Sequence, residues 1–214
     1  MKSTILLNKN FFIYEAENYL NEEFYRIREK LHSRLKIIIL EEDLNVNYYN
    51  IKLKRNRLSN FVVENIKNNF PQNGDVLYDY EYDKKSQTMY IYYIKGGRRV
   101  ADFIENVNDL EVKPIQFLIK EVLRNKFKIK DRILRSLIKI NEYYYYIIVE
   151  DQIIKKSLVE KNKDNVLKNM DIYNSNYRVY IDNNILDEIK ENMKNINLVS
   201  FDIMKGIYEE FEKK

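Results

Sequence analysis

Residues 75–126 constrain the fold of this chain most, because strand, turn and helix patterns follow one another there without interruption. Valine and tyrosine alternate with other residues over positions 76–82, and a continuous apolar run, mostly aromatic and β-branched, covers positions 89–94. The polar segment 83–86 separates the two runs, and this arrangement is typical of a β-hairpin. We therefore predict two antiparallel strands in the middle of the sequence.

Two helices are predicted after this hairpin. Gly96 and Gly97 break the second strand, and apolar residues recur at helical spacing over positions 100–107. Pro114 suits the start of a further helix, because the apolar residues within positions 115–123 share one helix face. A hairpin followed by helices indicates a fold more readily than an activity.

Composition bounds the class of protein. The 214 residues are 45% hydrophobic and 33% charged, which allows a buried core in one domain or two small lobes. The 37 basic and 33 acidic residues give a net charge of +4, too small to indicate nucleic-acid binding by itself. No cysteine and a single histidine, His32, exclude disulfides, thiolate sites and multi-histidine metal sites.

The apolar runs are far shorter than the ~20 residues of a membrane span, and the N-terminal segment is too soon polar for a signal peptide. We therefore expect a cytoplasmic protein. Before the central hairpin, the patterns predict a hairpin over residues 4–16, a helix over 20–35, a strand pair over 36–53, and a helix over 58–70 capped by Asn56. After residue 126 they predict a short helix over 129–139, a hairpin over 143–159, a helical or loop segment over 161–170, and a strand–helix–strand–helix unit over 177–211.

This order predicts a mixed α/β protein with a larger lobe, residues 1–127, and a smaller one, residues 128–214. Two of its segments carry candidate chemistry. The segment 95–99 contains two glycines and then Arg98 and Arg99 where a strand passes into a helix, so it is either a plain turn with exposed arginines or an anion or partner contact.

The predicted helix over residues 129–139 has a basic face, which is either a solvated surface or a surface for anionic lipid or nucleic acid. Consecutive tyrosines at 143–146 alternate between the two faces of a strand, so packing explains them better than base stacking. Acidic residues at positions 41–43, 75, 79 and 83 lie at predicted strand ends or turns, without a spacing that makes them converge.

The order of features resembles a known family. From residue 36 the chain reads KIIILEEDLNVNYYNIKLKRNRLSNFVVENIKNNFP, then VLYDYEYD, then YIYYIKGGRRVADFIENV and LEVKPIQFLIKEVL, and it closes with NYRVYIDNNILDEIKENMKNINLVSFDIMKGIYEEF. This order is similar to the actin-like cytoplasmic proteins of type IV pilus and type II secretion machines, the PilM and GspL families. The resemblance implies α/β architecture with mixed sheets and helices, in a reduced actin-like (ribonuclease H-like) two-lobe form.

The chain departs from that family where actin-like ATPases bind phosphate on glycine-containing hairpins. The first turn, residues 7–10, has neither the acid nor the glycine, and residues 150–152 at the second hairpin have no glycine. Asn183 and Asn184 replace the adenosine-side glycine pair. Because a Cβ atom occupies the space that a phosphate needs, we expect nucleotide binding to be lost or weak, with no cofactor.

The resemblance implies a non-enzymatic cytoplasmic scaffold, peripheral at the inner face of the membrane, that binds a single-span inner-membrane assembly protein and a motor ATPase. Two alternatives remain. One is a nucleic-acid-binding protein of a mobile element, and the other is a weak actin-like ATPase that keeps Asp151 or Asp182 to position a metal. The residues predicted to contact a partner are Arg98, Arg99, Lys128, Lys130, Arg132 and Arg135.

Overall fold

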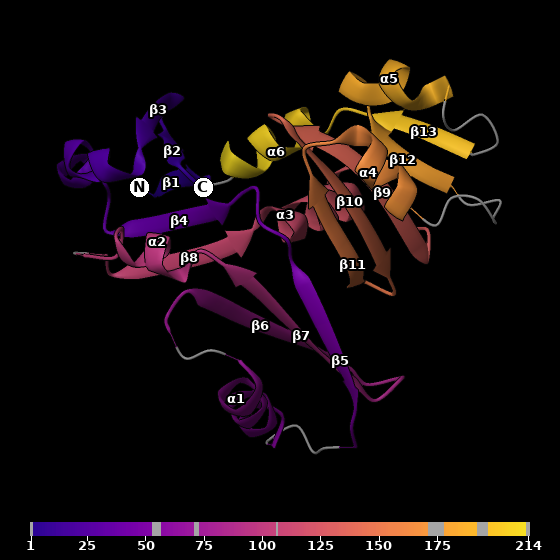
Figure 1. Cartoon of the computed structure of the whole chain (residues 1–214), viewed down its shortest axis with the longest axis horizontal. Helices are drawn as coiled ribbons and strands as arrows, with labels where there is room; N and C mark the ends of the chain where they lie inside the picture. Colours follow the sequence, from indigo (N-terminus) through magenta and orange to yellow (C-terminus); the bar gives the residue numbers. More distant parts are fainter. Residues whose placement is uncertain are drawn as a thin grey trace.

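A computed structural model of the chain describes residues 2–52, 57–70, 73–105, 107–170, 178–191 and 197–212. Three β-sheets and the helices between and around them make up this part of the chain (Figure 1). The Asn56 cap, together with the parts of predicted elements at 53–55, 177 and 192–196, lies outside the described residues.

The first sheet is formed by the N-terminal third of the chain and one later strand. Its order is β3-β2-β1-β4-β8, in which β1 is antiparallel to β2 and parallel to β4. Side chains in β1 alternate between fully and partly buried, as expected for a sheet with one face in the core. The strands are β1 (Ser3–Leu7), β2 (Phe11–Tyr14), β3 (Glu17–Leu20), β4 (Arg34–Ile39) and β8 (Asp109–Pro114).

The second sheet repeats the topology of the first. Its order is β11-β10-β9-β12-β13, with β9 antiparallel to β10 and parallel to β12. Each sheet is thus three antiparallel strands followed by two parallel ones, a repeat of structure without a repeat of sequence. The strands are β9 (Ile133–Ile140), β10 (Tyr143–Glu150), β11 (Ile153–Glu160), β12 (Arg178–Asp182) and β13 (Asn197–Phe201).

The third sheet is inserted between β4 and β8 and has the order β5-β7-β6. Its strands are β5 (Asn45–Asn50), β6 (Val76–Asp83) and β7 (Thr88–Lys95), and α1 (Leu58–Asn69) packs its apolar face on this sheet. The predicted central hairpin is confirmed, because β6 and β7 pair antiparallel with Asp83 opposite Thr88. Phe70, which follows α1, packs edge-on against Tyr78 and at a tilt against Tyr93, with ring centroids 5.3 and 4.8 Å apart.

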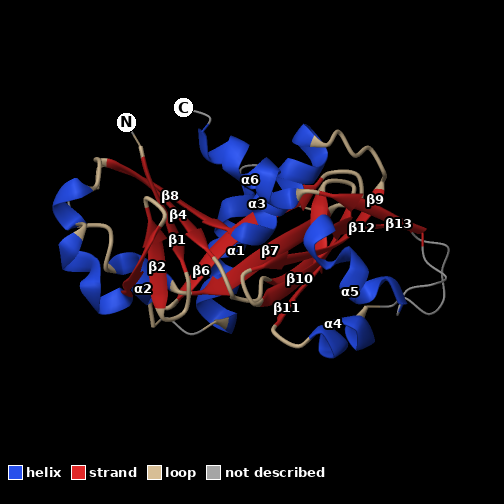
Figure 2. Ribbon diagram, turned by 90° about the horizontal axis from the view of Figure 1, so that it is seen from above, coloured by secondary structure: helices blue, strands red, loops and turns tan. Residues whose placement is uncertain are grey.

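One apolar core extends from the first sheet to the second. Between the two sheets lie α3 (Ile115–Glu121), its continuation as a π-helical turn (Val122–Lys126), and α6 (Ile203–Glu212), as Figure 2 shows from above. The predicted helix start at Pro114 is confirmed. On the outer face of the second sheet, α4 (Lys163–Asn169), a 3₁₀ turn (Asn183–Ile185) and α5 (Leu186–Lys190) cover a separate apolar cluster.

The predicted basic helix over residues 129–139 is wrong, because residues 133–140 form the central strand β9. Leu134 and Ile138 contribute to the core between the sheets, whereas Leu137 packs on the outer face. A strand buried on both faces is an apolar run, and over so few residues its spacing cannot be told from that of a buried helix.

The predicted helix over residues 20–35 is also wrong. Leu20 ends β3, two 3₁₀ turns (Asn21–Arg26 and Arg28–Lys30) follow, and β4 begins at Arg34. The apolar residues recur at helical spacing without forming a helix. Leu20 is exposed, whereas the others come from the first 3₁₀ turn, the links after each turn, and β4, and pack in the core: Phe24, Ile27, Leu31 and Leu35.

Two smaller predictions also need correction. The strands predicted at 36–41 and 45–53 do not pair, because β4 belongs to the first sheet and β5 to the third. The helix predicted over 100–107 is the short α2 (Gly97–Ala101), and the strand β8 that follows it has no counterpart among the predicted elements. In β8 charged and apolar residues alternate over only five positions before Pro114, which is a weak strand pattern.

Candidate functional site

The segment 41–43, which we call the strap, leaves the carboxyl end of β4 and contacts β10, β11, α2 and α3. The Glu41 backbone N–H donates to the Tyr145 hydroxyl of β10 at 3.0 Å. The Glu42 carbonyl accepts from Gln116 Nε2 of α3 at 2.8 Å, and Asp43 Oδ1 accepts from the Val159 N–H of β11 at 2.8 Å. The strap therefore joins the ends of both five-stranded sheets and the helix between them.

Arg99 of α2 fastens the first β-turn to the strap. Its Nη2 lies 2.6 Å from Glu42 Oε1, and its Nη1 donates to the carbonyl oxygen of Asn8. The two charged side chains are only 19% and 12% exposed, so this ion pair is largely shielded from water. Glu41 Oε2 also accepts from the Lys9 N–H at 3.3 Å. Arg99 is thus committed to contacts within the chain.

The glycine pair at 96–97 follows the last residue of β7 and is hydrogen-bonded to the residue that precedes β6. Both glycine N–H groups donate to the Asp75 carbonyl, at 2.9 and 2.8 Å. A Cβ atom on Gly97 would lie 2.3 Å from the Gly74 carbonyl oxygen, and Gly96 has a φ of +116°. The N–H groups that would have held an anion are therefore already bonded, which favours the plain-turn interpretation. Arg98 is exposed and its Nε donates to the Asn73 carbonyl at 3.3 Å.

The other predicted contact residues lie at the opposite end of the second sheet. Lys128, Lys130 and Arg132 are exposed in the loop before β9, and Arg132 pairs with Asp151 at 3.1 Å. The strap contacts Tyr145, which lies opposite Ile138 near the other end of β9. The structure therefore does not bring the two groups of basic residues together. Arg135 is half-buried within β9.

The two aspartates considered for a metal also lie apart. Asp151 occupies the turn after β10, beside the start of β9, whereas Asp182 ends β12, which runs parallel to β9. About five residues of β9 separate these ends, roughly 16 Å at the usual rise of a strand. No group of three His, Cys, Asp or Glu side chains that could hold a metal occurs within the described residues.

Asp182 is fully buried, and neither carboxylate oxygen has a well-aligned hydrogen-bond partner. Burial raises the pKa of this carboxyl, and the nearby Asp202 raises it further, while the backbone N–H of Asn184 opposes the shift. Asn8 at the end of β1 is likewise fully buried, with both side-chain polar atoms unpartnered. Asn8 lies in the first turn, between β1 and β2, whereas Asp182 ends β12 and belongs to neither of the two hairpin turns.

The repeated topology corrects one assignment. The counterpart of the first turn, between β1 and β2, is the turn between β9 and β10, residues 141–142, and not residues 150–152. Asn141 and Glu142 form this turn, so the second position also lacks glycine. Tyr144, Tyr145 and Tyr146, which follow it, are buried, and this confirms that they pack in the sheet.

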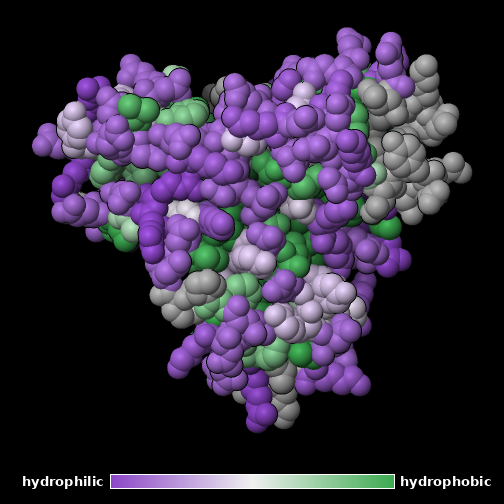
Figure 3. Space-filling model, viewed as in Figure 1, coloured by the Kyte–Doolittle hydropathy of each residue, from purple (hydrophilic) through white to green (hydrophobic). Residues whose placement is uncertain are grey.

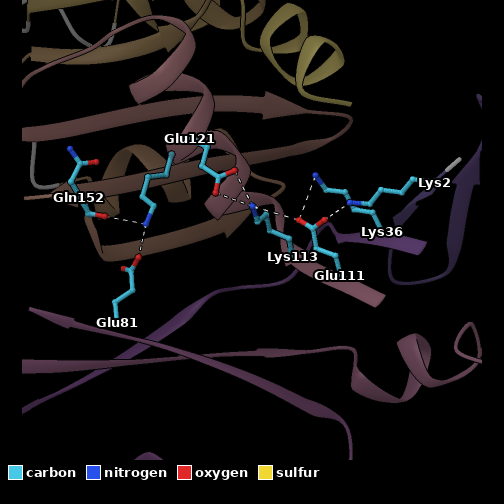
Figure 4. A network of polar contacts seen from close by, with 8 residues as sticks. Lys2, Lys36, Glu81, Glu111, Lys113, Glu121 and Gln152 are labelled. Atoms are coloured by element: carbon cyan, nitrogen blue, oxygen red, sulfur yellow. Dashed lines mark hydrogen bonds and ion pairs between the residues drawn. The ribbon is translucent and has the colours of Figure 1, made fainter. Parts of the chain in front are cut away.

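A polar network that the sequence did not predict crosses from the first sheet to α3 and the third sheet (Figure 4). Glu111 of β8 contacts Lys2 and lies 3.8 Å from both Lys36 and Lys113. Burial lowers the pKa of the Lys36 ammonium group. The hydrogen bond that Lys2 donates to Glu111 lowers the pKa of the Glu111 carboxyl. The network continues through Lys113–Glu121 at 2.9 Å and Lys120–Glu81 at 2.9 Å, with Lys120 also donating to the Gln152 carbonyl at 3.1 Å.

Apolar surface accompanies this network. Figure 3 shows hydrophobic residues where the third sheet meets the rest of the molecule. The half-buried side chains of Val46 in β5, Leu77 in β6 and Val112 in β8 pack against the core. Among the described helices, none is both long and apolar enough to cross a bilayer.

Two topologically equivalent five-stranded sheets, with α3 and α6 between them and a small inserted sheet on the first, define an actin-like fold. This is the fold that the sequence resemblance implied. No protein-family model matches the sequence, and no curated protein matches it either. Solved structures, in contrast, resemble nearly the whole chain.

Three of these structures are informative. The PilM–PilN type IV pilus biogenesis complex matches with a TM-score of 0.62 at 9% identity, over 99% of this chain and 92% of that one. A Bacteroides thetaiotaomicron protein with an actin-like ATPase fold and unknown function matches with 0.59 at 8% identity, over 97% and 95%. The cytoplasmic domain of EpsL, an inner-membrane component of the Vibrio cholerae type II secretion system, matches with 0.52 at 11% identity, over 84% and 81%. At these identities the likeness concerns the fold.

Proposed function

We propose that this chain is a non-enzymatic scaffold that binds a membrane-anchored partner in an assembly of the type IV pilus or type II secretion kind. The observation that supports this best is the state of the first turn, where an actin-like ATPase would present glycine to a phosphate. Arg99 binds the Asn8 carbonyl, Glu41 binds the Lys9 N–H, and Glu42 neutralises Arg99. The Lys9 N–H and the Arg99 guanidinium, two donors that a phosphate could use, are thus bonded to carboxylates of the chain itself.

The similar structures support this class of partner. PilM was solved in complex with PilN, and EpsL is an inner-membrane component of its system. By analogy, our proposal gives this chain a single-span membrane protein as partner, a place at the inner face of the membrane, and a motor ATPase as a further neighbour.

The surface proposed for the partner comprises the exposed basic residues. Arg99 is committed within the chain, and Arg135 is half-buried in β9. Lys128 and Lys130 are exposed in the loop before β9, beside Arg132, and Arg98 is exposed on α2. Of these residues, we propose the two loop lysines, Lys128 and Lys130, as the main contact for the partner, because within the described residues their ammonium groups have no partner.

Crosslinked co-purification from the native cell, with and without nuclease, tests the proposal. We expect mass spectrometry to identify a single-span membrane protein in both samples. Lys128→Ala with Lys130→Ala should reduce its recovery, whereas Lys84→Ala with Lys85→Ala should not. This control removes the same charge from the exposed β6–β7 turn. Recovery that disappears with nuclease would instead support the nucleic-acid-binding alternative.

A further inference from the structure

The strap is anchored at each of its three residues, and each anchor lies on a different element. Glu41 is held by β10, Glu42 by α2 and α3, and Asp43 by β11. The strap also connects β4 of the first sheet to β5 of the third. Movement of the second sheet away from the strap would break the bonds to β10 and β11. Movement of α2, which directly follows β7 of the third sheet, would break the pair of Glu42 with Arg99.

We propose that residues 41–43 are a built-in lock, which holds the three sheets in one arrangement without any bound ligand. The proposal concerns conformation and goes beyond the proposed partner. It rests on the combination of anchors rather than on any single bond. A loop that merely passes between two strands would need no contact to a different sheet, whereas this segment contacts the second sheet through two separate strands.

The environment of the lock makes its bonds costly to open. Tyr145 is fully buried, so its hydroxyl oxygen and the Glu41 N–H cannot be transferred to water without separating the sheets. Burial also raises the pKa of the Tyr145 hydroxyl, which keeps it neutral at physiological pH. Asp43 contributes a charged acceptor to the Val159 N–H, and such hydrogen bonds are stronger than neutral ones.

Glu41 has a φ of +63°, in the left-handed region that is unfavourable for residues other than glycine. The contacts of the strap offset this local cost, as expected where surrounding structure over-determines a backbone conformation. The same residue places its N–H toward Tyr145 and its carboxylate toward the Lys9 N–H. The sharp turn at Glu41 thus serves both the first sheet and the second.

A distance measurement between the two large sheets tests the lock. The chain contains no cysteine, so spin labels can be attached specifically after Asn18→Cys on β3 and Lys168→Cys on α4, both of which are exposed. For the otherwise unchanged chain we expect one narrow distance distribution, identical with and without Mg-ATP. Adding Asp43→Ala and Tyr145→Phe should broaden it or shift it to longer distances.

Tyr144→Phe is the matched control. It removes the neighbouring tyrosine hydroxyl, which donates to Glu188 at 2.7 Å on the outer face of the same sheet. We expect this variant to keep the narrow distribution. The proposal is overturned if the strap variant keeps it as well, or if Mg-ATP shifts the distribution of the unchanged chain.

Tyr145→Phe alone provides a second readout, in case the double variant does not fold. Losing one hydrogen bond of ordinary strength should raise the exchange rate of the Glu41 amide hydrogen about tenfold. The same rate in Tyr145→Phe and in Tyr144→Phe would mean that the hydroxyl does not hold the strap, and the lock would be rejected.

Discussion

Replacing Gly97 by alanine distinguishes a packing role of the glycine pair from an anion-binding role. The added Cβ atom would lie 2.3 Å from the Gly74 carbonyl oxygen and 3.1 Å from the Asp75 carbonyl carbon. Carbon and oxygen atoms normally approach no closer than about 3.3 Å, and both neighbours are backbone atoms. The chain must therefore shift by about 1 Å, which strains the two hydrogen bonds to the Asp75 carbonyl.

The expected magnitude combines three effects. Overpacking typically costs about 1–3 kcal/mol, and the two weakened hydrogen bonds cost about 1 kcal/mol each. Alanine at a helical position returns about 1 kcal/mol. We therefore expect Gly97→Ala to lower the free energy of unfolding by about 2–4 kcal/mol, which corresponds to a fall in Tm of roughly 5–15 °C for a chain of this size.

Urea denaturation followed by circular dichroism, with a thermal scan beside it, measures this effect. Arg98→Ala is the control, because the Arg98 side chain is exposed and its removal should change stability by less than about 0.5 kcal/mol. A Gly97→Ala variant as stable as the unchanged chain would refute the packing argument. A variant of normal stability that has lost affinity for phosphate would restore the anion-binding interpretation.

Two further predictions concern buried charge. Asp182→Asn should increase stability at pH 7 by on the order of 1 kcal/mol, because the pKa of Asp182 is raised in the folded chain. For a carboxyl with a raised pKa, the folded state is favoured at low pH, and this advantage is lost as pH rises through the folded pKa. The difference in unfolding free energy between Asp182→Asn and the unchanged chain should therefore shrink as pH falls from 7 toward 4. Denaturation curves at several pH values would contradict this if that difference grew. Arg99→Met should lower the free energy of unfolding by about 2–4 kcal/mol, because it leaves the Glu42 carboxylate, which is only 12% exposed, without its ion-pair partner. Adding Glu42→Gln should recover part of this loss. Additive losses in the double variant would show that the two residues are not coupled.

The sequence predicted well those elements whose pattern is local. The hairpin of β6 and β7 and the helix start at Pro114 are confirmed, because alternation, turn residues and proline act over a few residues. The order of features also indicated the actin-like fold, although no part of the sequence reveals that the two sheets share a topology. The pattern of β9 indicates a helix because the strand is buried on both faces, so its apolar residues do not alternate with polar ones.

The candidate site could be predicted only in part. The missing glycines at the turns are visible in the sequence. In contrast, Arg99 contacts Asn8, which lies 91 positions before it in the sequence, and Glu42, which lies 57 positions before it. Likewise, Asp43 meets Val159 across 116 positions. Such pairings depend on how three sheets pack, and a single sequence carries no local signal for them. The glycine pair is visible in the sequence, whereas its packing role depends on the close approach of Gly97 to Gly74 in the folded chain.

Calorimetry with two ligands tests the central claim most directly. The purified chain is titrated with Mg-ATP and, separately, with the cytoplasmic segment of the membrane protein recovered by co-purification. We predict saturable binding of the segment, unchanged by Mg-ATP, and no saturable heat with Mg-ATP alone. Tight, saturable binding of Mg-ATP, or a segment that binds only when Mg-ATP is present, would contradict a scaffold that works without nucleotide.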